Sequence, residues 1–201
     1  MNKSKKVFAE VDQLYSVATT SMGKWMWNNH TQWVADKAAN LAEKYNATIE
    51  TAYCAALLHD LGDSKYERGH KAFDSWSNQK GREILTTADF SEGEIENILA
   101  AVRTHSCRPG NLPTTLEGKV LATADAMWHL QTSFFPVICY MNRPQNTNTY
   151  EEWQDWFNGK VERDFGAKIF FDDEREEVRA DYEALRLVFA KKDLSSSADY
   201  E

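Results

Sequence analysis

Residues 49–63 read IETAYCAALLHDLGD, a run in which nearly every position before the histidine is apolar. A surface helix would show a polar face, so this pattern predicts a helix from Ile49 to Leu61 that is buried on all sides in a helical bundle. Gly62 ends it. The pair His59-Asp60 falls at that end. Burying such groups is costly unless they are paired or bound to a metal.

The pair can act together only where the helix ends. Adjacent side chains on a helix diverge by about 100°, so His59 and Asp60 can face one ion only near a frayed end, where the backbone turns. Gly62 supplies that turn. A helix C-terminus also carries partial negative charge, which favours a nearby cation.

Asp125 and His30 extend the set of candidate metal ligands. Asp125 follows the apolar run at 120–124 in mid-helix, where Asp is a poor helix former. We expect His30 to begin its helix, with Trp27 and Trp33 nearby to enclose a site. Two imidazoles and two carboxylates suit Mn²⁺, Fe²⁺, Co²⁺, Ni²⁺ or Zn²⁺ and leave positions for water and substrate. A lone buried His or Asp is more often a hydrogen-bonded core residue, so spacing alone leaves both interpretations open.

Helical periodicity continues on both sides of this run. The expected helices cover about residues 31–45, 73–87, 91–105 and 116–130, then two more after an Asn-rich loop at 142–149, the last near 173–190. No segment alternates convincingly with the period of a strand. We therefore expect one all-α domain over 1–192, with a core at about 25–130, a helical extension at about 147–190 and a disordered tail at 193–201.

Local signals mark both ends of one of these helices. Ser91 can cap its free backbone N–H groups, and Glu94, three residues later, can complete a capping box. The segment Ser106 to Thr115, which contains Pro109 and Pro113, predicts the loop that follows.

The composition describes an ordinary globular protein, with 42% hydrophobic and 27% charged residues and only nine Gly and four Pro. A net charge of -8 argues against a broad surface for a nucleic-acid polymer, although a small phosphorylated substrate needs only a few local cations. No stretch reaches the roughly 18 apolar residues of a membrane span, and no secretory signal opens the chain. The three cysteines form no C-x-x-C pair, so we expect the reducing cytoplasm.

The order His30 … His59-Asp60 … Asp125, on helices at these intervals, resembles the H…HD…D signature of the HD superfamily. Three segments carry the likeness: WNNHTQWVADKAANLAEKYN (27–46), AALLHDLGDSK (55–65) and GKVLATADAMWHL (118–130). The resemblance implies an HD-domain helical bundle with additional C-terminal helices. Members of this superfamily are mostly metal-dependent phosphohydrolases acting on phosphomonoesters, nucleotides, (p)ppGpp or cyclic dinucleotides. A minority are di-iron oxygenases, and some have lost activity.

The resemblance assigns His30, His59, Asp60 and Asp125 as metal ligands. Asp63 matches a position where several nucleotidase and (p)ppGpp-hydrolase relatives have an acidic residue, usually Glu, that activates water or protonates the leaving group. Asp is one methylene shorter than Glu. The alternative interpretation of Asp63 is a helix-terminal or turn residue that interacts with Lys65. Lys65 resembles a cation that contacts phosphate in many members, with a solvated surface lysine as the equal alternative.

His105 ends its helix in the run RTHS (103–106), where related hydrolases often have a His that contacts phosphate or binds a second metal. We expect one metal, with His105 near the phosphate and Arg103 or Arg108 on its other oxygens. His70 is interpreted as lining the entrance. His129 lies four residues after Asp125 and is interpreted as a buried structural residue in preference to a partner of the ligands.

These residues predict a metal-dependent phosphohydrolase that cleaves a phosphate ester or anhydride of a small molecule, with a nucleotide as the expected substrate and Asp60 and Asp63 as catalytic residues. The cofactor is a divalent ion, Mg²⁺ being a further candidate. Trp25, Trp27 and Trp33 could stack on a nucleobase, although core packing is the stronger interpretation. The alternatives are a non-catalytic metal- or nucleotide-binding module and, with less support, a di-iron oxygenase. The acidic helices at 150–190 offer a surface for a homodimer, unless they only pack on the bundle.

Overall fold

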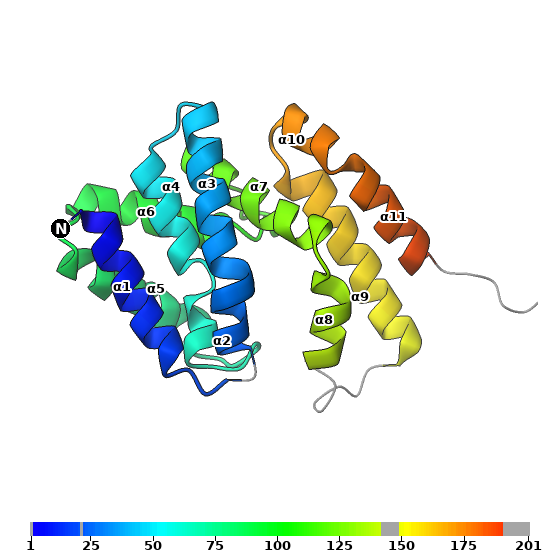
Figure 1. Ribbon diagram of the computed structural model, residues 1–201, viewed down its shortest axis with the longest axis horizontal. Helices are drawn as coiled ribbons and strands as arrows, with labels where there is room; N and C mark the ends of the chain where they lie inside the picture. The colour runs from blue at the N-terminus through cyan, green and yellow to red at the C-terminus, as the bar shows by residue number, and fades with distance from the viewer. Residues whose placement is uncertain (1, 21, 142–148, 191–201) are drawn as a thin grey trace, which may run out of the picture.

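The computed structural model describes residues 2–20, 22–141 and 149–190, and all regular structure in these residues is helical (Figure 1). The expected all-α class is therefore confirmed. The elements in chain order are α1 (Lys3–Ser16), α2 (Gly23–Met26), a π-helical turn (Trp27–Thr31), α3 (Gln32–Lys44), α4 (Ile49–Leu58), a 3-10 turn (Leu61–Ser64), α5 (Phe73–Thr87), α6 (Glu92–Thr104), α7 (Leu116–Gln131), α8 (Phe134–Met141), α9 (Tyr150–Arg163), a second π-helical turn (Asp164–Lys168), α10 (Asp172–Glu177) and α11 (Arg179–Phe189).

The helix α4 forms the centre of the bundle, as its apolar sequence predicts. Its side chains from Cys54 to Leu58 are all at most 1% exposed, and it packs against α1, α3, α6 and α7. The helix α7 is buried in the same way from Val120 to Leu130. Burial on every side leaves both helices in one register, so the groups at the end of α4 and in the middle of α7 have fixed positions.

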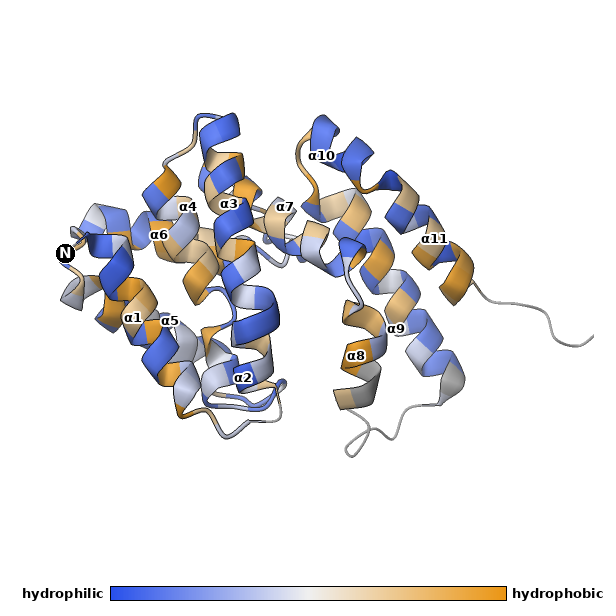
Figure 2. Cartoon of the chain, in the orientation of Figure 1, coloured by the Kyte–Doolittle hydropathy of each residue, from blue (hydrophilic) through white to orange (hydrophobic). Residues whose placement is uncertain are grey.

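Figure 1 shows two groups of helices on either side of α7, with α1–α6 in one group and α8–α11 in the other. The sequence of α8, FFPVICYM, is hydrophobic, whereas α10, DDEREE, is hydrophilic (Figure 2). Within the described residues no helix is both long enough and apolar enough to cross a membrane. The tail expected at 193–201 lies outside the described residues.

Two expected helix boundaries are wrong near the predicted ligands. The helix α4 ends at Leu58 rather than Leu61, because Asp60 leaves helical geometry with φ −116° and ψ 25°. His30 does not begin a helix, because α2, the π-helical turn and α3 form one continuous helical run from residue 23 to 44. Local periodicity does not reveal the wider π-helical turn, which has no hydrophobic signature of its own.

The outer helices also differ from expectation. The helix α1 has no counterpart among the predicted helices and buries Val7, Val11 and Tyr15 against the core. The helix expected near 173–190 is broken at Val178 into α10 and α11. The helix α8 also was not expected. Its Pro136 lies in the first turn, where the missing N–H of proline is tolerated.

Candidate metal centre

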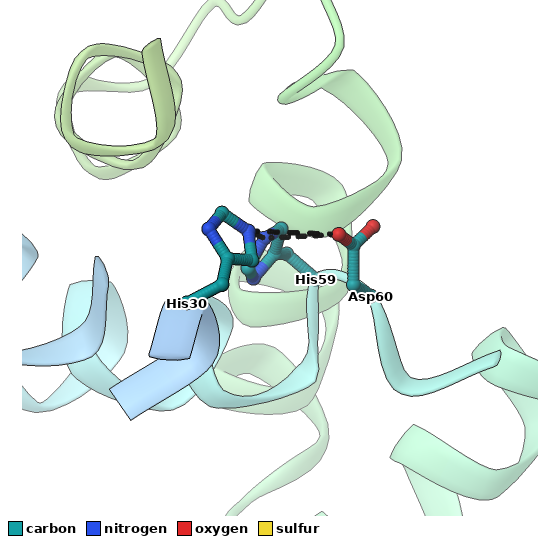
Figure 3. Close-up of side chains that lie close together, drawn as sticks. All are labelled: His30, His59 and Asp60. Carbon is teal, nitrogen blue, oxygen red and sulfur yellow. Dashed lines mark hydrogen bonds and ion pairs between the residues drawn. The ribbon is translucent and has the colours of Figure 1, made fainter. Parts of the chain in front are cut away.

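Four donor atoms converge where the centre of α7 meets the end of α4. The Nε2 atom of His30 lies 2.9 Å from Nε2 of His59, 3.6 Å from Oδ2 of Asp60 and 3.3 Å from Oδ1 of Asp125. Nε2 of His59 is 3.5 Å from Oδ2 of Asp60 and 3.7 Å from Oδ1 of Asp125. Figure 3 shows the two imidazoles turned toward the Asp60 carboxylate. All four residues are buried, at 0 to 7% exposure.

The position of His59 at the end of α4 fixes its tautomer. Its Nδ1 lies 2.6 Å from the carbonyl oxygen of Ala56, and a carbonyl can only accept, so Nδ1 carries the proton. Nε2 then presents a lone pair to the centre. His105 follows α6 in the same way, with Nδ1 2.6 Å from the carbonyl oxygen of Val102. The last carbonyl oxygens of a helix have no N–H partner within the helix. At the ends of α4 and α6 such an oxygen accepts a hydrogen bond from the following imidazole and so orients the ring.

The donor set fits a divalent ion. Oδ1 of Asp125 is buried and has no hydrogen-bond partner, although the Nε2 atoms of His30, His59 and His129 surround it. Leaving a charged oxygen unsatisfied is costly. For ligand bonds of about 2.1 Å, neighbouring donors lie about 3.0 Å apart at right angles and about 3.4 Å apart in a tetrahedron. The separations around Asp125 fall close to these values, so a bound cation would satisfy the oxygen.

Arg68 joins the two acidic residues of the HDLGD run. Its Nη2 donates to Oδ2 of Asp60 at 2.6 Å, and its Nε donates to Oδ1 of Asp63 at 2.8 Å. Burial acts to raise the pKa of Asp60, but the nearby Arg68 and His59 outweigh it and hold that pKa well below its ordinary value. Burial raises the pKa of Asp63 to about 6, although Arg68 opposes this.

Arg68, and not Lys65, is the cation that contacts these carboxylates. The ammonium of Lys65 lies over the rings of Tyr66 and Trp76, at 5.9 and 5.4 Å from their centroids, and its side chain is exposed. Asp63 pairs with Arg68 and not with Lys65. The sequence signal for Arg68 was weak, because it is one of several charged residues in the polar run KYERGHK after the buried helix.

The C-terminal part of the chain supplies a second set of charged groups to the same place. Lys168 donates to Oδ2 of Asp125. Nδ1 of His129 lies 3.1 Å from both Nζ of Lys160 and Oδ2 of Asp164, and Lys160 donates to the same carboxylate oxygen at 2.9 Å. Burial lowers the pKa of His129 to about 4 and also lowers that of Lys160. His129 is buried, as expected, and its Nε2 also lies 3.4 Å from Oδ1 of Asp125.

Sequence reasoning missed Lys160, Asp164 and Lys168. Their contacts span 31 to 43 positions of sequence, and they belong to no motif that could single them out. Asp164 and Lys168 begin and end the second π-helical turn, whereas His30 lies on the first. Both π-helical turns of the described chain therefore border the centre, in keeping with the frequent occurrence of such turns at functional sites.

Two cavities open on the centre, and both are lined by Asp60, Arg68, His105 and Arg108. One, of about 340 Å³, reaches Phe134, Trp156 and Lys160 on the α8–α9 side. The other, of about 830 Å³, lies toward α5 and α6 and is lined by His70 and Arg103. Lys65 lines neither cavity.

The tryptophans near His30 do not reach these cavities. Trp27 is buried, stacks on Tyr15 and donates from Nε1 to Asp12 at 2.7 Å. Trp25 packs against Trp128, and Trp33 is 38% exposed on α3. The interpretation of Trp27 as a core residue fits this placement. The tryptophan that borders the smaller cavity is Trp156, from the part of the chain in which sequence showed no motif.

Comparison with known proteins gives one family and one solved fold. Residues 28–127, which contain all four donor residues, match the HD domain model. A solved structure described as "The crystal structure of Bacillus subtilis YpgQ in complex with ADP" is similar over 94% of each chain, with a TM-score of 0.64 and 22% sequence identity. At that identity the likeness shows a shared fold. No curated protein matches the chain.

Proposed function

Because the chain belongs to the HD superfamily, we propose that it is a metal-dependent phosphohydrolase that cleaves a phosphate ester or anhydride of a nucleotide. The observation that carries this proposal is that Nε2 of His30 and Nε2 of His59 each lie within 3.7 Å of a carboxylate oxygen of Asp60 and one of Asp125, the latter buried without a hydrogen bond. A divalent ion held by these four residues would polarise a phosphoryl oxygen and lower the pKa of water.

Asp63 is the proton carrier in this proposal. A general acid or base works best when its pKa lies near the working pH, and burial raises the pKa of Asp63 to about 6. Arg68 binds both oxygens of Asp63 and one oxygen of Asp60, which holds the two carboxylates in a fixed relation. Asp63 itself lines neither cavity, so Arg68, which lines both, connects it to the centre.

His105 accepts a hydrogen bond in this proposal. With its Nδ1 proton donated to Val102, neutral His105 has only a lone pair on Nε2. Burial lowers its pKa to about 4, which favours this neutral form, in which Nε2 accepts a hydrogen bond. We therefore assign it to orienting a water molecule or a hydroxyl group at the border of the two cavities.

The lysines favour a single metal over the two ions of an oxygenase. A second ion would need further ligands such as His129, yet the ammonium of Lys160 lies 3.1 Å from its Nδ1. Lys168 occupies the other oxygen of Asp125, which would otherwise be free to bridge two ions. Two ammonium groups at these positions repel a second divalent cation.

Two observations support a nucleotide. The smaller cavity combines cationic side chains with an aromatic wall, which suits a ligand that is anionic at one end and flat at the other. The similar Bacillus subtilis structure was solved in complex with ADP.

The test is hydrolysis of nucleoside mono-, di- and triphosphates and an aryl phosphate by protein stripped and reloaded with Mn²⁺, Co²⁺, Ni²⁺, Fe²⁺, Zn²⁺ or Mg²⁺. We expect phosphate or pyrophosphate release that requires the metal, disappears in Asp60→Ala and persists in Asp36→Ala, a control on the exposed face of α3. If no substrate is hydrolysed while one equivalent of metal is bound, the protein is a non-catalytic binding module. If no substrate is hydrolysed and no metal is bound, the four-residue centre itself is overturned.

A further inference from the structure

The smaller cavity contains two cations without an anionic partner. Five cationic side chains line it, against two carboxylates, those of Asp60 and Asp125. Three of the cations are paired: Arg68 with Asp60 and Asp63, Lys160 with Asp164, and Lys168 with Asp125. Among the described residues, no ion pair involves the other two, Arg108 and Arg163.

Arg108 and Arg163 reach the cavity from separate parts of the chain. Arg108 lies in the loop after α6, and Arg163 is the last residue of α9. Both line the smaller cavity, and Cys107 directly precedes Arg108 in the loop. Cys107 has a φ of 48°, in the left-handed region that side chains other than glycine rarely adopt. This turn of the backbone carries the loop to the mouth of both cavities, where Arg108 is exposed.

The lining of the smaller cavity suits an anionic ligand that also has a flat apolar part. The carboxylates of the metal centre and the apolar side chains of Phe134, Ile138 and Trp156 line the same cavity as the two arginines. A guanidinium binds a phosphate through paired hydrogen bonds. In a chain with a net charge of -8, an excess of cations in one cavity is a local feature that attracts anions.

We infer that Arg108 and Arg163 bind a second phosphate group, adjacent to the one at the metal centre, so that the protein selects nucleoside di- and triphosphates over monophosphates. The nucleoside then lies against the wall formed by Phe134, Ile138 and Trp156. This inference rests on the proposed function, because it takes the metal centre as the site of the first phosphate. Arg108 and Arg163 are specificity-determining residues in this arrangement and take no part in the transfer of protons.

The experiment measures binding and not turnover. Calorimetric titration of the Mn²⁺-loaded protein with the methylene phosphonate analogues of AMP and of ADP, which are not hydrolysed, gives the preference for the second phosphate. We expect the wild-type chain to bind the ADP analogue at least about tenfold more tightly, as a charge-assisted contact implies. Arg163→Gln should remove most of this preference and leave the affinity for the AMP analogue within about twofold of wild type, and Arg108→Gln should weaken binding of the ADP analogue more than binding of the AMP analogue.

Arg186→Gln is the matched control. Arg186 lies on α11, its side chain is 59% exposed, and it lines neither cavity, so its loss should change neither affinity. Arg108 and Arg163 are themselves exposed, so their variants should fold, and circular dichroism checks this directly. Equal affinities of the two analogues in the wild type would overturn the inference. Equal losses of both affinities in the arginine variants, or no loss of either, would also overturn it.

The outcome separates this inference from the proposed function. Turnover of phosphate esters without an arginine-dependent preference would overturn the role of Arg108 and Arg163 alone. An intact preference in a protein that hydrolyses nothing would overturn the proposed phosphohydrolase and leave the phosphate-binding role of the arginines in place.

Discussion

The region from α2 to α7 and the region from α8 to α11 face the same centre with different chemistry. The first contributes the candidate metal ligands His30, His59, Asp60 and Asp125, and it carries a recognisable family pattern. The second contributes Lys160 and Lys168 together with an apolar wall, and it matches no sequence motif. A metal ion accepts few ligand types in a narrow geometry, whereas the charge of a substrate can be met by cations from many positions. Sequence patterns therefore indicate the candidate metal ligands, and only the arrangement in space brings the lysines of the second region to them.

The strongest test of this comparison is the contact between Asp125 and Lys168, which joins the two regions. Asp125→Asn removes the nearer of the two anionic partners of Lys168, which is 3% exposed, and leaves only Asp164 at 4.0 Å. A buried charge that loses its nearer partner is costly, so the free energy of unfolding of the metal-free protein should fall by about 3 kcal/mol, measured by urea denaturation. The double variant Asp125→Asn/Lys168→Met should recover much of this loss but bind no metal. Unchanged stability in the single variant would show that the two regions are energetically independent.

The next effect concerns proton transfer within the first region. Asp63→Asn should lower kcat about 100-fold, because general acid–base catalysis contributes at least that factor, while the metal content stays at one equivalent. Asp63→Glu restores the longer side chain that is usual at the matching position of related hydrolases and should keep most of the activity. Steady-state kinetics with metal analysis provides the measurement. Full activity in Asp63→Asn would leave Asp63 as a structural partner of Arg68.

The smallest effect concerns the apolar wall of the second region. Trp156 is 41% exposed and lines the smaller cavity, so Trp156→Ala should raise KM for a nucleotide about fivefold, the equivalent of about 1 kcal/mol of stacking. KM for inorganic tripolyphosphate, which has no base, should not change. Trp33→Ala removes a tryptophan of similar exposure on α3 that borders neither cavity. A larger rise in KM for the nucleotide in Trp33→Ala than in Trp156→Ala would place the contact with the nucleobase in the first region.

The buried core and the closeness of the candidate metal ligands to one another were largely predictable from the sequence. The apolar run of α4 predicted its central place, and the capping box of Ser91 and Glu94 is present, with the Ser91 N–H donating to the Glu94 carboxylate at 2.7 Å. The argument that His59 and Asp60 can face one ion only at a frayed helix end agrees with the geometry of Asp60. These features depend on neighbours close in the chain, which local patterns report reliably.

The remaining features depend on contacts between distant segments. The position of His30 inside a helix requires a π-helical turn that has no sequence signature. The contact of Lys168 with Asp125 spans 43 residues, and a lysine in sequence is ordinarily a solvated surface group. The pairing of Asp63 with Arg68 instead of Lys65 depends on how the segment after the 3-10 turn folds back.

The two π-helical turns also affect how this chain lines up with its relatives. A π-helical turn spans one more residue than an α-helical turn between its hydrogen-bonded ends. Beside a relative whose helix stays regular, residues 27–31 and 164–168 would each show a single extra position, and a gap-free alignment would shift one flank by one residue. Such a shift rotates every side chain on that flank by about 100° and misplaces His30 or Lys168. Alignments of this family should therefore allow one-residue insertions inside these helices, where insertions are normally penalised.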